Sequence, residues 1–136
     1  MQIVIDTNIV IDYLEDREPF AENAARLLNL CEEGTVTGML TANAITDIYY
    51  VVHKKVGRER TLDAIKTLCS FLEIADIGKT DIFGAIELDM SDFEDALVAQ
   101  CAKRVKADCI ITRNLTDFKN SPVPAKEPKD FLQEFD

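Results

Sequence analysis

Short apolar runs alternate with helical spans along this chain of 136 residues, and this alternation limits its fold more than any other feature. The runs that predict strands lie at residues 2–6, 35–40, 73–75 and 109–112. Between them, apolar residues recur at the spacing of an amphipathic helix. Strands separated by helices favour an α/β sandwich with a mostly parallel sheet.

The helical spans have local start and stop signals. Proline suits the first turn of a helix, so we expect Pro19 to open one that ends at Gly34. The other expected helices cover residues 8–15, residues 41 or 43 to the break at Gly57, the span from there to Leu72, and roughly 78–88 and 92–107. Phe131, Leu132 and Phe135 predict a small helix at the end of the chain.

Length and composition indicate a soluble globule. A chain of this size suits one domain, residues 1–136, and its 47% hydrophobic residues are ordinary for such a protein. No apolar run approaches the roughly 18–20 residues that span a bilayer. Asp6 interrupts the N-terminal run, so we expect no membrane segment, no secretory signal and a cytoplasmic location.

The cysteine spacing and the net charge argue against two classes of function, zinc binding and nucleic-acid binding by overall charge. The four cysteines have no zinc-binding spacing and lie in apolar stretches, which predicts buried free thiols: Cys31, Cys69, Cys101 and Cys109. The formal charge of −10 argues against binding nucleic acid by overall electrostatics. It leaves room for a local basic rim, such as His53–Lys55 with Arg58 and Arg60, and for a basic partner protein.

Acidic residues stand at four places where the expected strands end or the following helices begin. These are Asp6 after the first strand, Asp47 in the helix after the second, Asp92 and Asp95 at a later helix start, and Asp117 after the strand 109–112. Strands in one parallel sheet would bring these places to its carboxyl edge, where open α/β sheets bind ligands.

Such a cluster is costly without a cation. Two carboxylates about 4 Å apart repel by roughly 4 kcal/mol at an effective dielectric constant of 20. Several together therefore imply raised pKa values or a bound metal. Oxygen-only ligands favour Mg²⁺ or Mn²⁺ over zinc. A metal held in this way can activate water and neutralise the charge of a phosphodiester under attack.

Plainer explanations exist for the same residues. Asp6, or one of the two residues after it, could cap a helix. Asp92 could complement a helix dipole, and Asp117 could be only a turn residue. Asp95 is harder to explain in this way, because the apolar residues Ala96–Ala99 follow it and buried acids usually have a partner.

Four segments together resemble a PIN domain, and in particular its small bacterial members that include VapC-like toxins. They are Ile5-Asp6-Thr7-Asn8, Ala44-Ile45-Thr46-Asp47, Asp92-Phe93-Glu94-Asp95-Ala96-Leu97, and Ile111-Thr112-Arg113-Asn114 with Asp117-Phe118. Each motif is weak alone, but the four occur in the right order over nearly the whole chain. The resemblance implies a three-layer α/β/α sandwich, an Mg²⁺- or Mn²⁺-dependent endoribonuclease that acts on RNA, an antitoxin partner and a homodimer.

The resemblance also assigns roles by position. Asp6 would be the metal ligand after the first strand, Asp47 the second acid, Asp95 the third, and Asp117 or Asn114 the fourth. Two departures matter. The second acid is usually Glu, which is one methylene longer, and the fourth motif often reads Thr-Arg-Asp. The neutral oxygen of Asn114 would hold a second metal weakly, which puts two-metal catalysis in doubt, whereas a one-metal mechanism survives.

Neighbouring residues could support these acids. Thr7, Asn8 and Thr112 could hydrogen-bond the Asp6 carboxylate or a coordinated water. Arg113 could contact a phosphate with its forked guanidinium, or form an ion pair that relieves the acidic cluster. Whether Asp92 completes the site is left open. The apolar stretch 48–52 suits a helix between the core and a partner subunit.

Three other functions compete with the nuclease. Asp47 and Asn114 are compatible with a PIN-like domain of degraded catalysis that binds RNA or protein. A phosphohydrolase with Asp6 as nucleophile would place a second Asp two residues later, where this chain has Asn8. A phospho-receiver domain would want Lys after a later strand, where Arg113 stands. The sequence therefore favours a metal-dependent endoribonuclease.

Overall fold

The computed structural model describes residues 1–136 and centres on a five-stranded sheet. The strands are β1 (Gln2–Ile5), β2 (Thr37–Thr41), β3 (Glu73–Ala75), β4 (Cys109–Ile111) and β5 (Ala125–Lys126). Their order is β3-β2-β1-β4-β5, and every neighbouring pair is parallel. The predicted parallel sheet is confirmed. Strand β5 was not predicted, because no apolar run marks it in the sequence.

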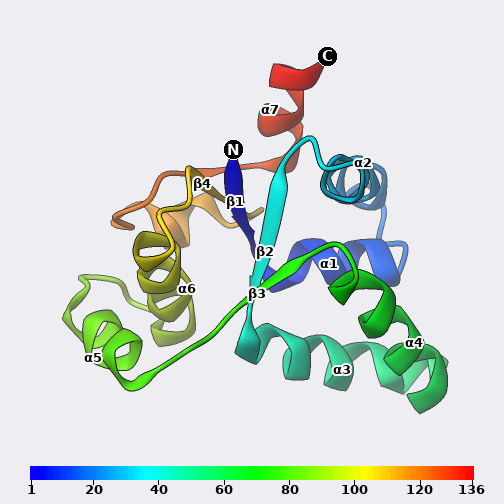
Figure 1. Ribbon diagram of the computed structural model, residues 1–136, viewed down its shortest axis with the longest axis horizontal. Helices are drawn as coiled ribbons and strands as arrows, with labels where there is room; N and C mark the ends of the chain where they lie inside the picture. The colour runs from blue at the N-terminus through cyan, green and yellow to red at the C-terminus, as the bar shows by residue number, and fades with distance from the viewer.

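Helices cover both faces of this sheet, as the sandwich requires (Figure 1). They are α1 (Thr7–Leu14), α2 (Ala21–Glu32), α3 (Ala42–Val56), α4 (Arg58–Cys69), α5 (Lys79–Glu87), α6 (Phe93–Arg104) and α7 (Pro128–Leu132), with 3₁₀ turns η1 (Leu115–Phe118) and η2 (Gln133–Phe135). Helices α1 to α4 and α7 pack on one side, and α5 and α6 lie on the other. This is the expected three-layer arrangement.

Side-chain alternation in β1 explains the two apolar layers. Ile3 and Ile5 belong to the larger core under α1 to α4, whereas Val4 packs with Ile110 and Val98 against α6. All three β1 residues are almost fully buried. A strand buried on both faces is apolar throughout, which is why it appears in the sequence as a continuous run.

The structure corrects two local predictions. Pro19 does not open α2, because the chain first turns at residues 18–20 and the amides of Phe20 and Ala21 both donate to the Arg17 carbonyl. Helix α2 therefore begins at Ala21. Cys69 is exposed at the end of α4, whereas the other three free cysteines are buried as expected. No helix combines the length and the apolar character that crossing a bilayer requires.

Candidate active site

A groove of about 440 Å³ lies at the carboxyl edge of the sheet, where the segments after β1, β2 and β4 meet. The four acids predicted as metal ligands, Asp6, Asp47, Asp95 and Asp117, all line it. So do four of the predicted supporting residues, namely Thr7, Asn8, Asp92 and Asn114. Parallel topology thus brings together residues that are more than 100 positions apart in the chain.

Asp6 is the most enclosed acid in this groove, with only 7% of its surface exposed. It precedes α1 but makes no capping bond to that helix. Its Oδ2 instead accepts a hydrogen bond of 2.8 Å from Thr112 Oγ1, and that hydroxyl oxygen accepts one of 3.0 Å from the Asn114 amide. Burial raises the pKa of Asp6, and the charge of Asp117 adds to this, although the Thr112 bond opposes it.

Asp92 and Asp95 share the first turn of α6 but do different work. Asp92 Oδ1 caps the helix, because it accepts a hydrogen bond of 2.9 Å from the Asp95 amide. Asp92 therefore has a structural role at the helix start, and it also lines the groove. The pKa of Asp95 rises to about 6, first through burial and then through the charges of Asp92, Asp6 and Asp117. These acids therefore lie close enough to repel one another.

Glu94 is a sixth carboxylate of the groove, and the sequence interpretation missed it. Its pKa rises to about 7, first because of a hydrogen bond to the Asp47 side chain, then through burial and the neighbouring negative charges. Asp47 comes from α3 and Glu94 from α6, so the pair joins the two helical layers across the groove. The run of acids from Asp92 to Asp95 was the signal that could have found Glu94.

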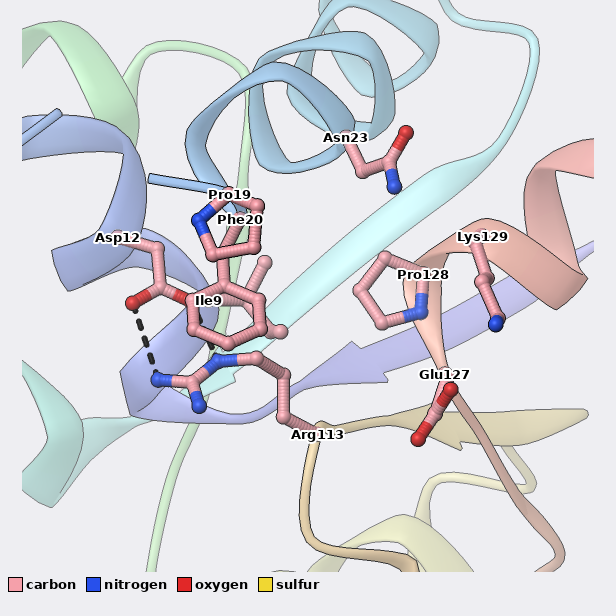
Figure 2. A pocket seen from close by; sticks show the side chains of 9 residues that line it. All are labelled: Ile9, Asp12, Pro19, Phe20, Asn23, Arg113, Glu127, Pro128 and Lys129. Atoms are coloured by element: carbon pink, nitrogen blue, oxygen red, sulfur yellow. Dashed lines mark hydrogen bonds and ion pairs between the residues drawn. The ribbon is translucent and has the colours of Figure 1, made fainter. Parts of the chain in front are cut away.

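Arg113 does not line this groove, and its contact with a phosphate stays a prediction. Its Nε and Nη2 donate to Asp12 Oδ2 and Oδ1 at 2.6 and 3.0 Å, as Figure 2 shows. The predicted ion pair exists, but its partner is not the acidic cluster. Asp12 is fully buried on α1 and was also missed. Its signal was a single charge directly after the apolar run Ile9–Ile11.

The predicted apolar stretch of α3 is only partly buried. Ile48 and Val52 are in the core, but Tyr50 is 62% exposed and lines the acidic groove. His53 is the only histidine. Its ring stacks on that of Tyr49 in the same helix, with ring centroids 4.8 Å apart.

The donor set of the groove fits a hard divalent cation. Carboxylate oxygens dominate it, with the amide oxygen of Asn114 as a neutral donor. No three acidic, cysteine or histidine side chains form a ready-made metal-binding group. Raised pKa values at Asp6, Asp95 and Glu94 are what mutual repulsion and burial produce when no cation offsets them. Asp6, Asp47, Asp95 and Asp117 could hold such an ion.

Known proteins share this sequence pattern and this fold. Residues 2–116 match the model of a PIN domain family. Ribonuclease VapC1 of Aquifex aeolicus (strain VF5) is 25% identical over 118 residues, which are 83% of this chain and 81% of the relative.

Two solved structures illustrate the shared fold. VapBC2 from Rickettsia felis, bound to a DNA fragment from its promoter, has a chain with a TM-score of 0.70 and 21% identity, covering 93% of this chain and 98% of that one. DNA-bound VapBC from Salmonella typhimurium gives a TM-score of 0.72 at 18% identity, covering 94% and 98%. Since the family match extends over most of the chain and its acidic motifs meet in one groove, this protein belongs to the PIN domain family.

Proposed function

We propose that this protein is an Mg²⁺- or Mn²⁺-dependent endoribonuclease that hydrolyses RNA phosphodiester bonds. The observation that supports it best is the gathering of Asp6, Asp47, Asp95 and Asp117 from separate elements in one groove at the carboxyl edge of the sheet. The name of the relative from Aquifex aeolicus, a ribonuclease, agrees with this activity.

The residues of the groove have distinct tasks in this proposal. A bound divalent ion supplies Lewis acidity, which lowers the pKa of water and neutralises phosphate charge. Asp6, Asp47, Asp95 and Asp117 would hold it. Thr112 fixes the orientation of the Asp6 carboxylate through its 2.8 Å bond. Glu94, whose pKa rises to about 7, holds a proton more readily than an ordinary glutamate and so reduces its repulsion with Asp47.

A toxin of this kind would need an antitoxin, and we propose where one binds. An apolar groove of about 210 Å³ lies between α1, α2 and α4, lined by Leu14, Leu28, Leu68 and Phe71 among others. The net charge of −10 favours a basic partner. The similar structures from Rickettsia felis and Salmonella typhimurium are VapBC assemblies, which supports a partner of this class.

Two further properties belong to the proposal. Ile82, Phe83 and Ile86 form an exposed apolar face on α5, which favours a homodimer. Light scattering of the purified chain and of Phe83→Glu would test this, since a monomeric wild type would contradict it. We place the activity in the cytoplasm, where the RNA substrate lies and where free thiols are kept reduced.

Cleavage of a mixed structured RNA pool tests the activity directly. We expect cleavage with Mg²⁺ or Mn²⁺, none with EDTA, and none by Asp6→Asn, which keeps the side-chain shape but removes the charge. Asp63→Asn is the matched control, because Asp63 is exposed on α4 outside the groove. Wild-type protein that neither cleaves RNA nor binds Mn²⁺ would contradict the nuclease and favour the PIN-like binding module instead.

A further inference from the structure

Arg113 is held by a forked ion pair just outside the acidic groove. Two of its nitrogens donate to the two oxygens of Asp12 at 2.6 and 3.0 Å. Asp12 has no exposed surface, and the Arg113 side chain is 25% exposed. A bidentate pair of this kind fixes both the position and the orientation of the guanidinium.

The surroundings keep this pair apart from the groove. The Phe20 ring centroid lies 4.0 Å from the guanidinium carbon, and Figure 2 shows the ring close beside the pair. Arg113 and Asp12 border a separate cavity of about 360 Å³, which shares no lining residue with the acidic groove. The Arg113 side chain therefore borders this cavity and not the groove, although Arg113 follows directly after Thr112, which bonds Asp6.

The backbone on either side of Arg113 carries groove residues. Thr112 is bonded to Asp6, and the Asn114 amide is bonded to the Thr112 hydroxyl. The Asp117 amide then donates 3.0 Å to the Asn114 carbonyl, which forms the 3₁₀ turn η1. The position of Asn114 and Asp117 thus depends on how the chain is anchored at residues 112 and 113.

Both anchors of this loop belong to one short segment. Asp6 directly precedes α1, and Asp12 lies within α1. Thr112 hydrogen-bonds Asp6 at the start of this segment, and Arg113 hydrogen-bonds Asp12 further along the helix. Two bonds to separate points of one rigid element prevent the loop from swinging, whereas one bond would leave a hinge.

We propose that Asp12 and Arg113 are positioning residues: their ion pair sets the loop 113–117 so that Asn114 and Asp117 face the acidic groove, and it keeps the guanidinium from competing with a cation there. The inference rests on the proposed function, since it treats these two residues as parts of a metal site. A cationic guanidinium among the groove carboxylates would occupy the oxygens that a metal ion needs.

Two variants test this positioning role. Arg113→Lys keeps the positive charge but loses the fork. The double variant Asp12→Asn/Arg113→Gln removes both charges together, so that no uncompensated charge stays buried and the fold survives. Arg17→Gln is the matched control, since Arg17 approaches the same carboxylate at 3.9 Å but lies outside the loop.

The first measurement is hydrogen exchange of the metal-free protein. The amides of Asn114 and Asp117 are hydrogen-bonded, so their protection is measurable. We expect both variants to exchange them about tenfold faster, while the amides of β1 and β4 keep their protection. Calorimetry with Mn²⁺ should show a dissociation constant raised about tenfold or more, as when residues that orient metal ligands are lost. The control should match the wild type in both.

Unchanged exchange at Asn114 and Asp117 in the double variant would overturn the inference. Exchange that increases equally throughout the sheet would also overturn it, because the pair would then be a general stabiliser. A wild type that binds Mn²⁺ but cleaves no RNA contradicts the proposed function and leaves both readouts to decide the positioning role. A wild type that binds no Mn²⁺ overturns the inference together with the proposed function.

Discussion

Replacing Asp95 by Asn should make the protein more stable and at the same time remove its response to metal. Asn has nearly the same shape as Asp but carries no charge. In the folded chain, Asp95 is partly buried and is repelled by Asp92, Asp6 and Asp117. Removing its charge relieves that repulsion, so the free energy of unfolding should rise in metal-free buffer.

The size of the effect follows from the pKa of Asp95. A rise from 3.8 to about 6 corresponds to roughly 3 kcal/mol against the ionised form, at about 1.4 kcal/mol for each pKa unit. Asp95 is only partly buried, so solvent screening reduces this to about 1 kcal/mol. For a protein of this size, about 1 kcal/mol changes Tm by roughly 3–5 °C.

The pH dependence has a definite sign. The pKa of Asp95 is higher in the folded chain than its ordinary value, so the folded state binds the proton more tightly. The wild type therefore carries the full penalty above about pH 6 and loses it as the pH falls from there towards 3.8. The advantage of Asp95→Asn should be largest at pH 7.5 and should shrink over the same range.

Thermal unfolding in EDTA and in Mn²⁺ measures both effects. Mn²⁺ at 100 times its dissociation constant should stabilise the wild type by about 2.7 kcal/mol but should leave Asp95→Asn nearly unchanged. Asp63→Asn serves as the charge-matched control. The reasoning is refuted if Asp95→Asn is less stable than the wild type at pH 7.5, if its gain does not vary with pH, or if Mn²⁺ stabilises both proteins equally.

Three other changes have equally specific outcomes. Gly38→Ala should destabilise the fold by about 1–3 kcal/mol in urea, because its Cβ would lie 2.6 Å from Cys31 Sγ; an unchanged urea midpoint would contradict this. Thr112→Val removes the hydroxyl that donates to buried Asp6, so urea unfolding should show a loss of about 1–3 kcal/mol, and equal stability would count against that bond. Tyr50→Ala should leave stability within about 0.5 kcal/mol, but it should raise the KM for RNA about fivefold or more if the exposed ring stacks on a base; an unchanged KM would exclude stacking.

Much of the fold could be predicted because its signals are local. Val4 and Ile110 lie in runs that are apolar on both faces, and such runs are typical of a strand covered by helices on both sides. β5 could not be found in this way. It has two residues and lies between Pro124 and Pro128. It forms only because the amides of Ile110 and Thr112, at the edge of β4, donate hydrogen bonds to the Pro124 and Lys126 carbonyls.

The acids of the groove could be predicted for a related reason. Asp6 ends a strand, and Asp95 opens a helix against the core, so each has a local explanation for its place. Glu94 and Asp12 had only weak local signals, and their partners come from distant parts of the chain. In the sequence, Glu94 is indistinguishable from a solvated surface acid, and only the fold places Asp47 of the other helical layer beside it. The role of Asp12 depends on a loop near the other end of the chain.

The sequence by itself determined the first four strands, most helix boundaries and the edge of the sheet at which the acids collect, because periodicity, chain breaks and parallel connections are properties of short segments. Only the tertiary structure decided which charges meet. Arg113 pairs with Asp12 across 101 positions of sequence, and Thr112 bonds Asp6 across 106. Such pairings depend on a few ångströms of packing between distant elements, and no local pattern records that distance.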